Sequence, residues 1–141
     1  MNLDQIITAL WPRIQMLVQP VWQTWSPTCT GFSAQPTNSV YRYCVQGKLV
    51  TCAIRQGTAG TSNAISFTIP LPLTAATITN MAWGAVLPFV TDHGAILTTA
   101  GAAAIQSGAT AIFLYTTAGG GAWTDHDGKG VGAFVIQYEI P

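Results

Sequence analysis

The segment from Ser39 to Arg55 constrains the fold most strongly, because it has the pattern of a β-hairpin. Two runs rich in β-branched, aromatic and small residues, 40–46 and 49–55, flank a short polar break that contains Gly47. Glycine adopts the positive φ of a tight turn at little cost. Alternation along the second run places Val50, Cys52 and Ile54 on one face. A sheet with one apolar face needs a second layer to cover it, so the hairpin predicts a layered β-structure.

Similar patterns continue beyond the hairpin. Residues 65–71 alternate between apolar and polar side chains and are predicted to extend the hairpin into a meander. Further strands are expected at 76–86, 95–100, 102–106, 109–116 and 131–140. About eight short strands separated by turn signals are typical of a sandwich or jelly roll. We therefore predict an all-β, jelly-roll-like antiparallel β-sandwich over residues 25–141, preceded by a helical segment over residues 1–24.

The N-terminal segment has the periodicity of a helix that packs on other helices. Its apolar residues recur with alternating gaps of four and three, at Leu3, Ile7, Leu10, Ile14, Leu17 and Val21. Asn2 or Asp4 is predicted to cap the start of the helix, and the prolines predict a kink near Pro12 and an end before Pro20. The segment has no basic leader region and no run of ~20 apolar residues, so we expect neither a signal peptide nor a membrane span.

Two interpretations of this helix are open. It either folds against its own sandwich or acts as an oligomerisation or docking segment, and we favour the second. The side chains predicted to make contact with other proteins are Leu3, Ile7, Leu10, Trp11, Ile14, Leu17, Trp22 and Trp25.

Charge is scarce in this chain. Charged residues make up 7% of 141 residues, against roughly a quarter in an ordinary soluble domain, and 49% of the residues are hydrophobic. With so few charges, little repulsion opposes association. We therefore expect copies of the chain or another protein to cover much of its surface. The five basic residues are scattered rather than clustered, which argues against a nucleic-acid partner.

The sequence offers little catalytic chemistry. It has no G-x-S-x-G motif, and its three cysteines fall in or beside predicted strands, where inert buried thiols are expected. Cys44 and Cys52 lie on facing hairpin arms and could approach each other if the register suits. We predict that the protein is not an enzyme and uses no cofactor.

The best cluster of titratable residues is Asp125-His126-Asp127, which Asp92-His93 could join in space. Carboxylate and imidazole groups could hold a divalent cation. The alternative, which we favour, is a hairpin turn that uses Asp-Gly for its backbone geometry, so no metal is predicted. Trp123 precedes this turn and could stack on a sugar if exposed, which makes Trp123, Asp125 and His126 a possible ligand loop; a core or interface role for Trp123 is the alternative.

The run from Trp25 to Arg55, W-S-P-T-C-T-G-F through G-K-L-V, followed by T-S-N-A-I-S-F-T-I-P-L-P, resembles a module of tailed-bacteriophage virion proteins. In that module a W-x-P-x-x-x-G-F opening precedes an aromatic strand, a G-K-L-V turn and a T-S-N-A strand. It occurs in head-decoration proteins, head fibres and tail-fibre tips. The resemblance covers residues 25–72 and carries no catalytic residues.

The resemblance implies a virion structural protein that is made in the cytoplasm of the host bacterium. Combined with the apolar N-terminus, it predicts a capsid decoration, cement or head-fibre protein. We expect a homotrimer that docks through its N-terminus on the major capsid protein or another virion protein. The alternative is a tail-fibre tip that recognises host-surface carbohydrate through Trp123, Asp125 and His126; a hydrolase is a third and weaker reading.

Overall fold

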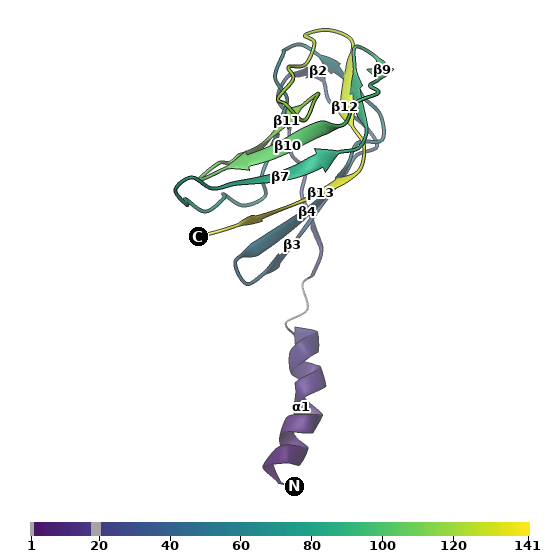
Figure 1. Cartoon of the computed structure of the whole chain (residues 1–141). Coiled ribbons are helices and arrows are strands. Elements are labelled where there is room, and N and C mark those ends of the chain that lie inside the picture. Colours follow the sequence, from purple (N-terminus) through teal and green to yellow (C-terminus); the bar gives the residue numbers. More distant parts are fainter. Residues whose placement is uncertain (1, 18–20) are drawn as a thin grey trace.

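The computed structural model describes residues 2–17 and 21–141, and the side chains of residues 2–10 and 21–141. Within these residues the protein is an all-β fold of three antiparallel sheets preceded by one helix (Figure 1). The elements are α1 (Leu3–Leu17), β1 (Gln23–Thr24), β2 (Phe32–Ala34), β3 (Val40–Gln46), β4 (Leu49–Arg55), β5 (Gly60–Ser62), β6 (Thr68–Pro70), β7 (Ala82–Leu87), β8 (Val90–Asp92), β9 (Ala95–Ile96), β10 (Gly101–Gln106), β11 (Ala111–Tyr115), β12 (Gly128–Val131) and β13 (Phe134–Glu139).

The first sheet has the order β1-β3-β4-β13 and contains the predicted hairpin. Strands β3 and β4 pair along their whole length, and Gly47 turns between them with a φ of 61°. The predicted meander is wrong, because β13 and not the 65–71 run occupies the second edge of β4. Six residues of β13 pair with β4, whereas the 65–71 run contributes only the three residues of β6, which pair with β11.

The hairpin register also decides the state of the cysteines. Tyr43 lies opposite Cys52, and Cys44 lies opposite Thr51, so the two cysteines project from opposite faces of the sheet. Both are free and buried, as is Cys29. The prediction of buried thiols is confirmed, and the hairpin register separates the two cysteines that the sequence left as a possible pair.

The second sheet has the order β6-β11-β10-β7 and packs against the first (Figure 1). Apolar side chains from both sheets share one core, which includes Cys52 and Ile136 from the first sheet and Ile105 and Ile112 from the second. Trp83 of β7 also meets the ring of Tyr138 of β13 edge-on, with the ring centroids 6.4 Å apart. This arrangement confirms a sandwich-like packing of antiparallel sheets.

The third sheet, β2-β5-β12-β8-β9, lies at one end of these two layers (Figure 1). It arises because the predicted long strand 131–140 breaks at Gly132 into β12 and β13. A Cβ atom at Gly132 would lie 2.9 Å from Cβ of Phe89, so the chain passes too closely here for a side chain. The predicted strands at 76–86 and 95–100 shrink to β7 and β9. The described residues therefore contain thirteen short strands instead of about eight.

Of the two predicted capping residues, Asn2 takes this role, and α1 begins at the next residue, Leu3. The side chain of Asn2 accepts a hydrogen bond from the backbone N–H of Gln5, and Gln5 Oε1 accepts one from the backbone N–H of Asn2. This reciprocal pair satisfies two donors at the helix start. The helix is described as far as Leu17, and the predicted end before Pro20 lies outside the described residues. Within residues 2–17 and 21–141, no helix combines the length and apolar character needed to cross a membrane.

Candidate functional site

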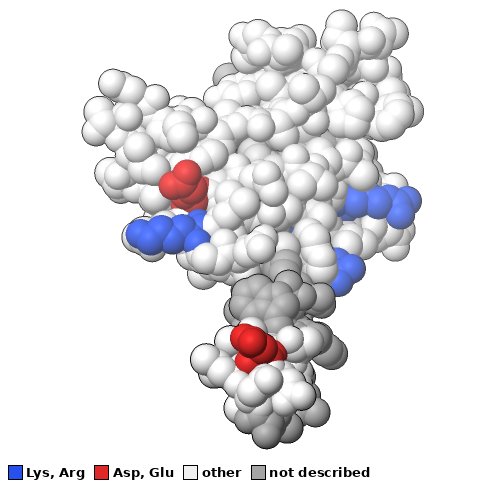
Figure 2. Space-filling view, turned by 60° about the horizontal axis from the view of Figure 1, so that its bottom comes forward, with Lys and Arg blue, Asp and Glu red and all other residues white. Residues whose placement is uncertain are grey.

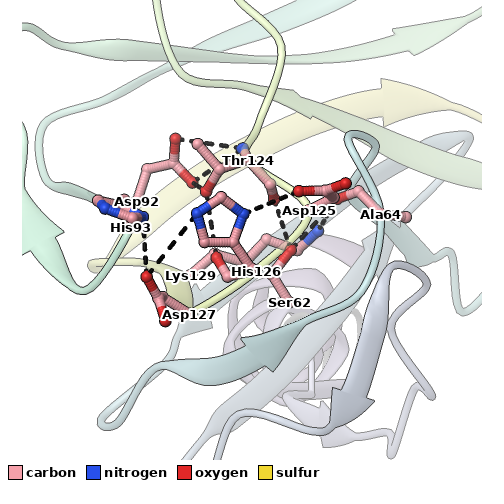
Figure 3. Close-up of polar contacts among 9 residues, drawn as sticks. All are labelled: Ser62, Ala64, Asp92, His93, Thr124, Asp125, His126, Asp127 and Lys129. Carbon is pink, nitrogen blue, oxygen red and sulfur yellow. Dashed lines mark hydrogen bonds and ion pairs between the residues drawn. The ribbon is translucent and has the colours of Figure 1, made fainter.

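A turn within the third sheet meets the loop that leads from the second sheet into the third, and together they form the candidate site (Figure 3). One is the turn from β8 to β9, which contains His93, and the other is the loop from β11 to β12, which contains residues 124–127. The buried carboxylate of Asp92 accepts hydrogen bonds from the backbone N–H and the hydroxyl of Thr124, at 3.2 and 2.9 Å. On the other side of the turn, the N–H of Gly94 donates to the carbonyl of Gly128 at 2.9 Å.

These bonds bring two histidines and an aspartate together. Nδ1 of His93 lies 2.8 Å from Oδ2 of Asp127, and Nε2 of His126 lies 4.0 Å from the same oxygen. The two imidazole rings meet edge-on, with centroids 4.8 Å apart. All three residues are exposed. The structure thus confirms that Asp92-His93 joins Asp125-His126-Asp127 in space. The predicted hairpin turn is wrong, because β11 and β12, the strands on either side of this loop, lie in different sheets.

Asp125 holds the His126 ring from the other side. Oδ1 of Asp125 lies 2.8 Å from Nδ1 of His126. This hydrogen bond raises the pKa of His126 and holds the pKa of Asp125 below its ordinary value. The nearby charges of Asp127, Asp125 and Asp92 also raise the pKa of His126. The cluster is therefore a region of negative potential around two imidazoles.

Lys129, which the sequence did not single out, holds a neighbouring segment of the chain beside the candidate site. Its side chain is fully buried, and Nζ donates hydrogen bonds to the carbonyls of Ala64 and Ser66, each at 2.8 Å. The ammonium also lies 4.9 Å from the centre of the Phe32 ring. Burial lowers the pKa of Lys129. The sequence does not indicate that this lysine is buried, because Lys129 stands in a glycine-rich turn. Its hydrogen-bond partners are backbone carbonyls more than sixty residues away along the chain.

Trp123 does not meet the condition for stacking on a sugar, because its side chain is buried. Its side chain is only 3% exposed, and its indole N–H donates to the carbonyl of Leu114 at 2.7 Å. The ring also packs edge-on against Phe67. Of the predicted ligand loop, only Asp125 and His126 offer exposed side chains, and the Trp123 ring takes its alternative role as a core residue.

The predicted contact side chains divide into two groups. Leu3, Ile7 and Leu10 are exposed on the helix, and Trp22 is exposed with the Arg42 guanidinium 5.5 Å from the centre of its ring. Trp25 instead packs against the core, where its indole N–H donates to the carbonyl of Pro70 at 3.1 Å. The side chains of Trp11, Ile14 and Leu17 lie outside the described residues.

No protein family matches this chain, and no curated protein matches it.

Proposed function

We propose that this protein is a non-enzymatic structural component of a tailed-bacteriophage virion. In this proposal it is a capsid decoration, cement or head-fibre protein that forms a homotrimer and docks on another virion protein through its N-terminus. The observation that carries the proposal is the apolar stripe of the helix, whose described side chains, Leu3, Ile7 and Leu10, are exposed. The resemblance of residues 25–72 to phage virion modules supplies the class of particle.

The helix supports the docking role through its exposed fractions. The side chains of Leu3, Ile7 and Leu10 are 69%, 51% and 45% exposed, although their spacing puts them on one face. Figure 1 shows the helix apart from the sheets. Full burial of one such side chain is worth about 1.5–3 kcal/mol, so covering the stripe with a partner would supply substantial binding energy. This geometry favours docking over the alternative of a helix folded on its own sandwich.

The three sheets together form the β body, and its surface also supports assembly. Large apolar side chains such as Val86, Phe89, Ile96 and Val135 are more than half exposed. Val135 also lines an open groove of about 330 Å³ together with Val40, Ala53 and Phe134. Figure 2 shows only a few charged side chains, separated by wide uncharged areas, on one face of the molecule. Such a surface suits contacts with many neighbouring copies in a particle, where modest interactions are multiplied.

A carbohydrate-binding tip has weaker support. The aromatic ring that the sequence offered for stacking on a sugar, Trp123, is buried under the loop. Asp125 and His126 remain exposed, but no exposed aromatic side chain within the predicted loop accompanies them. We therefore place the capsid role first and use glycan binding as the competing outcome of the test.

The test is co-sedimentation of the full chain with purified phage capsids that lack it. The double variant Ile7→Asp/Leu10→Asp puts two charges into the stripe, and we expect it to lower capsid binding at least tenfold. The matched control, Thr8→Asp/Ala9→Asp, puts two charges on another face of the same exposed segment and is expected to bind normally. Binding of the unchanged protein to a glycan array without capsid binding would overturn the proposal in favour of the tip.

A further inference from the structure

We propose that His93, His126 and Asp127 form a surface site for one divalent transition-metal ion of the zinc type, with a remaining coordination position open to water. The inference is independent of the virion role, because it rests only on the loops that form the candidate site. One ligand atom from each of the three side chains lies within 4.8 Å of the others.

The ligand types select the class of ion. Two imidazole nitrogens and one carboxylate oxygen are ligands that Zn²⁺ uses in three-residue sites with an open position. Ca²⁺ and Mg²⁺ instead prefer sets made of oxygen atoms alone. The surrounding carboxylates of Asp92 and Asp125 add negative charge that favours any divalent cation, so the nitrogen ligands supply the selectivity.

The distances fit such an ion after side-chain movements. Ligands about 2.1 Å from a tetrahedral zinc ion lie about 3.4 Å from one another. The separations to Asp127 Oδ2, 2.8 Å from His93 and 4.0 Å from His126, bracket this value. The ligand atoms lie as far as 4.8 Å from one another, so an ion has to draw them together by up to about 1.4 Å to reach this geometry. All three side chains are exposed and free to adjust. For coordination through Nδ1 of His93, the proton on that nitrogen moves through solvent to Nε2, and the ion takes its place beside Asp127.

Asp125 provides the outer support that metal-binding histidines usually have. Its carboxylate accepts a hydrogen bond from Nδ1 of His126 when that nitrogen carries the proton. This tautomer leaves the lone pair of Nε2 free to face Asp127. The arrangement of carboxylate, histidine and ligand position is therefore already formed, which distinguishes the cluster from a chance meeting of polar side chains.

The fold fixes the backbone on each side of the ligands. Asp92 holds Thr124, Gly94 holds Gly128, and the N–H of Ser62 donates to the carbonyl of Asp127 at 2.7 Å. The hydroxyl of Ser62 donates to the carbonyl of Thr124 at 2.6 Å. These bonds join three separate segments of the chain. The backbone that carries the ligands is therefore already ordered, so ion binding costs little conformational entropy.

The test is calorimetric titration of the full chain at pH 7.5 with Zn²⁺, Mg²⁺ and Ca²⁺ after removal of metals by a chelator. We expect one zinc ion per chain and at least tenfold weaker binding of Mg²⁺ and Ca²⁺. His126→Ala and His93→Asn are each expected to weaken zinc binding at least tenfold. Asparagine is chosen at position 93 because it tolerates the positive φ of 52° there. Asp125→Asn is expected to weaken binding by about ten- to a hundredfold through the outer support.

Two controls keep the result specific. Asp4→Asn removes an exposed carboxylate on the helix and is expected to leave zinc binding unchanged. The visible spectrum of the Co²⁺ complex is expected to lack a sulfur-to-metal charge-transfer band, because the three cysteines are buried. Three outcomes would each overturn the site: absence of zinc binding, zinc binding by His93→Asn or His126→Ala that is as tight as that of the unchanged protein, or a thiolate band in the cobalt spectrum. Circular dichroism verifies that each variant is folded.

Discussion

At the scale of single residues, Lys129 is the side chain whose environment departs most from expectation for its type. A buried ammonium needs partners, and here the carbonyls of Ala64 and Ser66 supply them. These bonds tie the start of β12 to the segment between β5 and β6. Gly31 also depends on this packing, because a Cβ atom there would lie 2.7 Å from Nζ of Lys129.

We predict that Lys129→Met lowers the free energy of unfolding by about 1–3 kcal/mol, because two hydrogen bonds from a charged donor to the carbonyls of Ala64 and Ser66 are lost. Lys48→Met is the matched control, since Lys48 is exposed in the β3–β4 turn, and a change within about 0.5 kcal/mol is expected there. Urea denaturation measures both variants. If Lys129→Met were as stable as the unchanged protein, the desolvation of the ammonium would outweigh its hydrogen bonds.

Two buried groups, Cys52 and Tyr138, and the half-buried Tyr41 predict a loss of stability in alkali. Burial raises the pKa of Cys52 to about 12 and that of Tyr41 to about 12, and it raises the pKa of Tyr138 still further. Above pH 9 the unfolded chain loses protons that the folded chain keeps, so the free energy of unfolding falls as pH rises toward 12. Cys52 alone contributes a slope of about 1.4 kcal/mol per pH unit.

Urea midpoints measured between pH 7 and pH 10.5 check this expectation. The unchanged protein is expected to lose stability steadily above pH 9, and Cys52→Ala is expected to show a shallower slope despite lower stability at pH 7. A flat profile up to pH 10.5 would show that these groups titrate normally in the folded protein.

At the scale of elements, β13 forms one edge of the first sheet and contributes side chains to the shared core. Its inward residues Phe134, Ile136 and Tyr138 are buried, whereas Val135 is 56% exposed on the other face. The hydroxyl of Tyr138 donates to the carbonyl of Leu73 at 2.8 Å, which fastens the loop before β7 to the core. The strand therefore connects the first sheet with the loop that leads into β7 of the second sheet.

Substitutions along β13 should report this alternation. We expect Ile136→Ala to cost about 2–5 kcal/mol of unfolding free energy through the cavity it leaves, and Tyr138→Phe about 0.5–1.5 kcal/mol through the lost hydrogen bond. Val135→Ala, on the outer face of the same strand, is expected to cost less than about 1 kcal/mol. Equal costs at positions 135 and 136 would contradict the assigned faces. Urea denaturation again provides the measurement.

At the scale of the whole molecule, the helix and the β body present separate apolar surfaces. The proposed trimer could be held by either one, and the two possibilities predict different behaviour on truncation. The β body carries the shared core of the first two sheets, and the described side chains of the helix, from Asn2 to Leu10, are all exposed. These facts favour a trimer formed by the β body and a helix available for docking.

Light scattering of the full chain and of a chain that starts at Gln23 tests this division. We expect both to have about three times the chain mass of 14.9 kDa. If only the full chain forms a trimer, the helix is the oligomerisation element, and the docking role loses its main support. If the full chain is a monomer at all concentrations, the homotrimer is wrong.

The sequence by itself determined the features that depend on neighbours along the chain. The hairpin of β3 and β4, the inward face of β13 and the Asn2 cap follow from alternation, a turn glycine and capping chemistry within a few residues. Side-chain alternation states which face of a strand is buried, because it arises from local backbone geometry.

Only the tertiary structure decided which segments meet. Alternation does not state which strand lies at the edge of β4, and strands as short as β8 or β9 carry too few residues for a period. The burial of Lys129 depends on bonds to backbone carbonyls more than sixty residues away, and that of Trp123 on packing against Phe67 from another segment. The meeting of His93 with His126 and Asp127 depends on hydrogen bonds that join loops more than thirty residues apart, so the candidate site exists only in the folded chain.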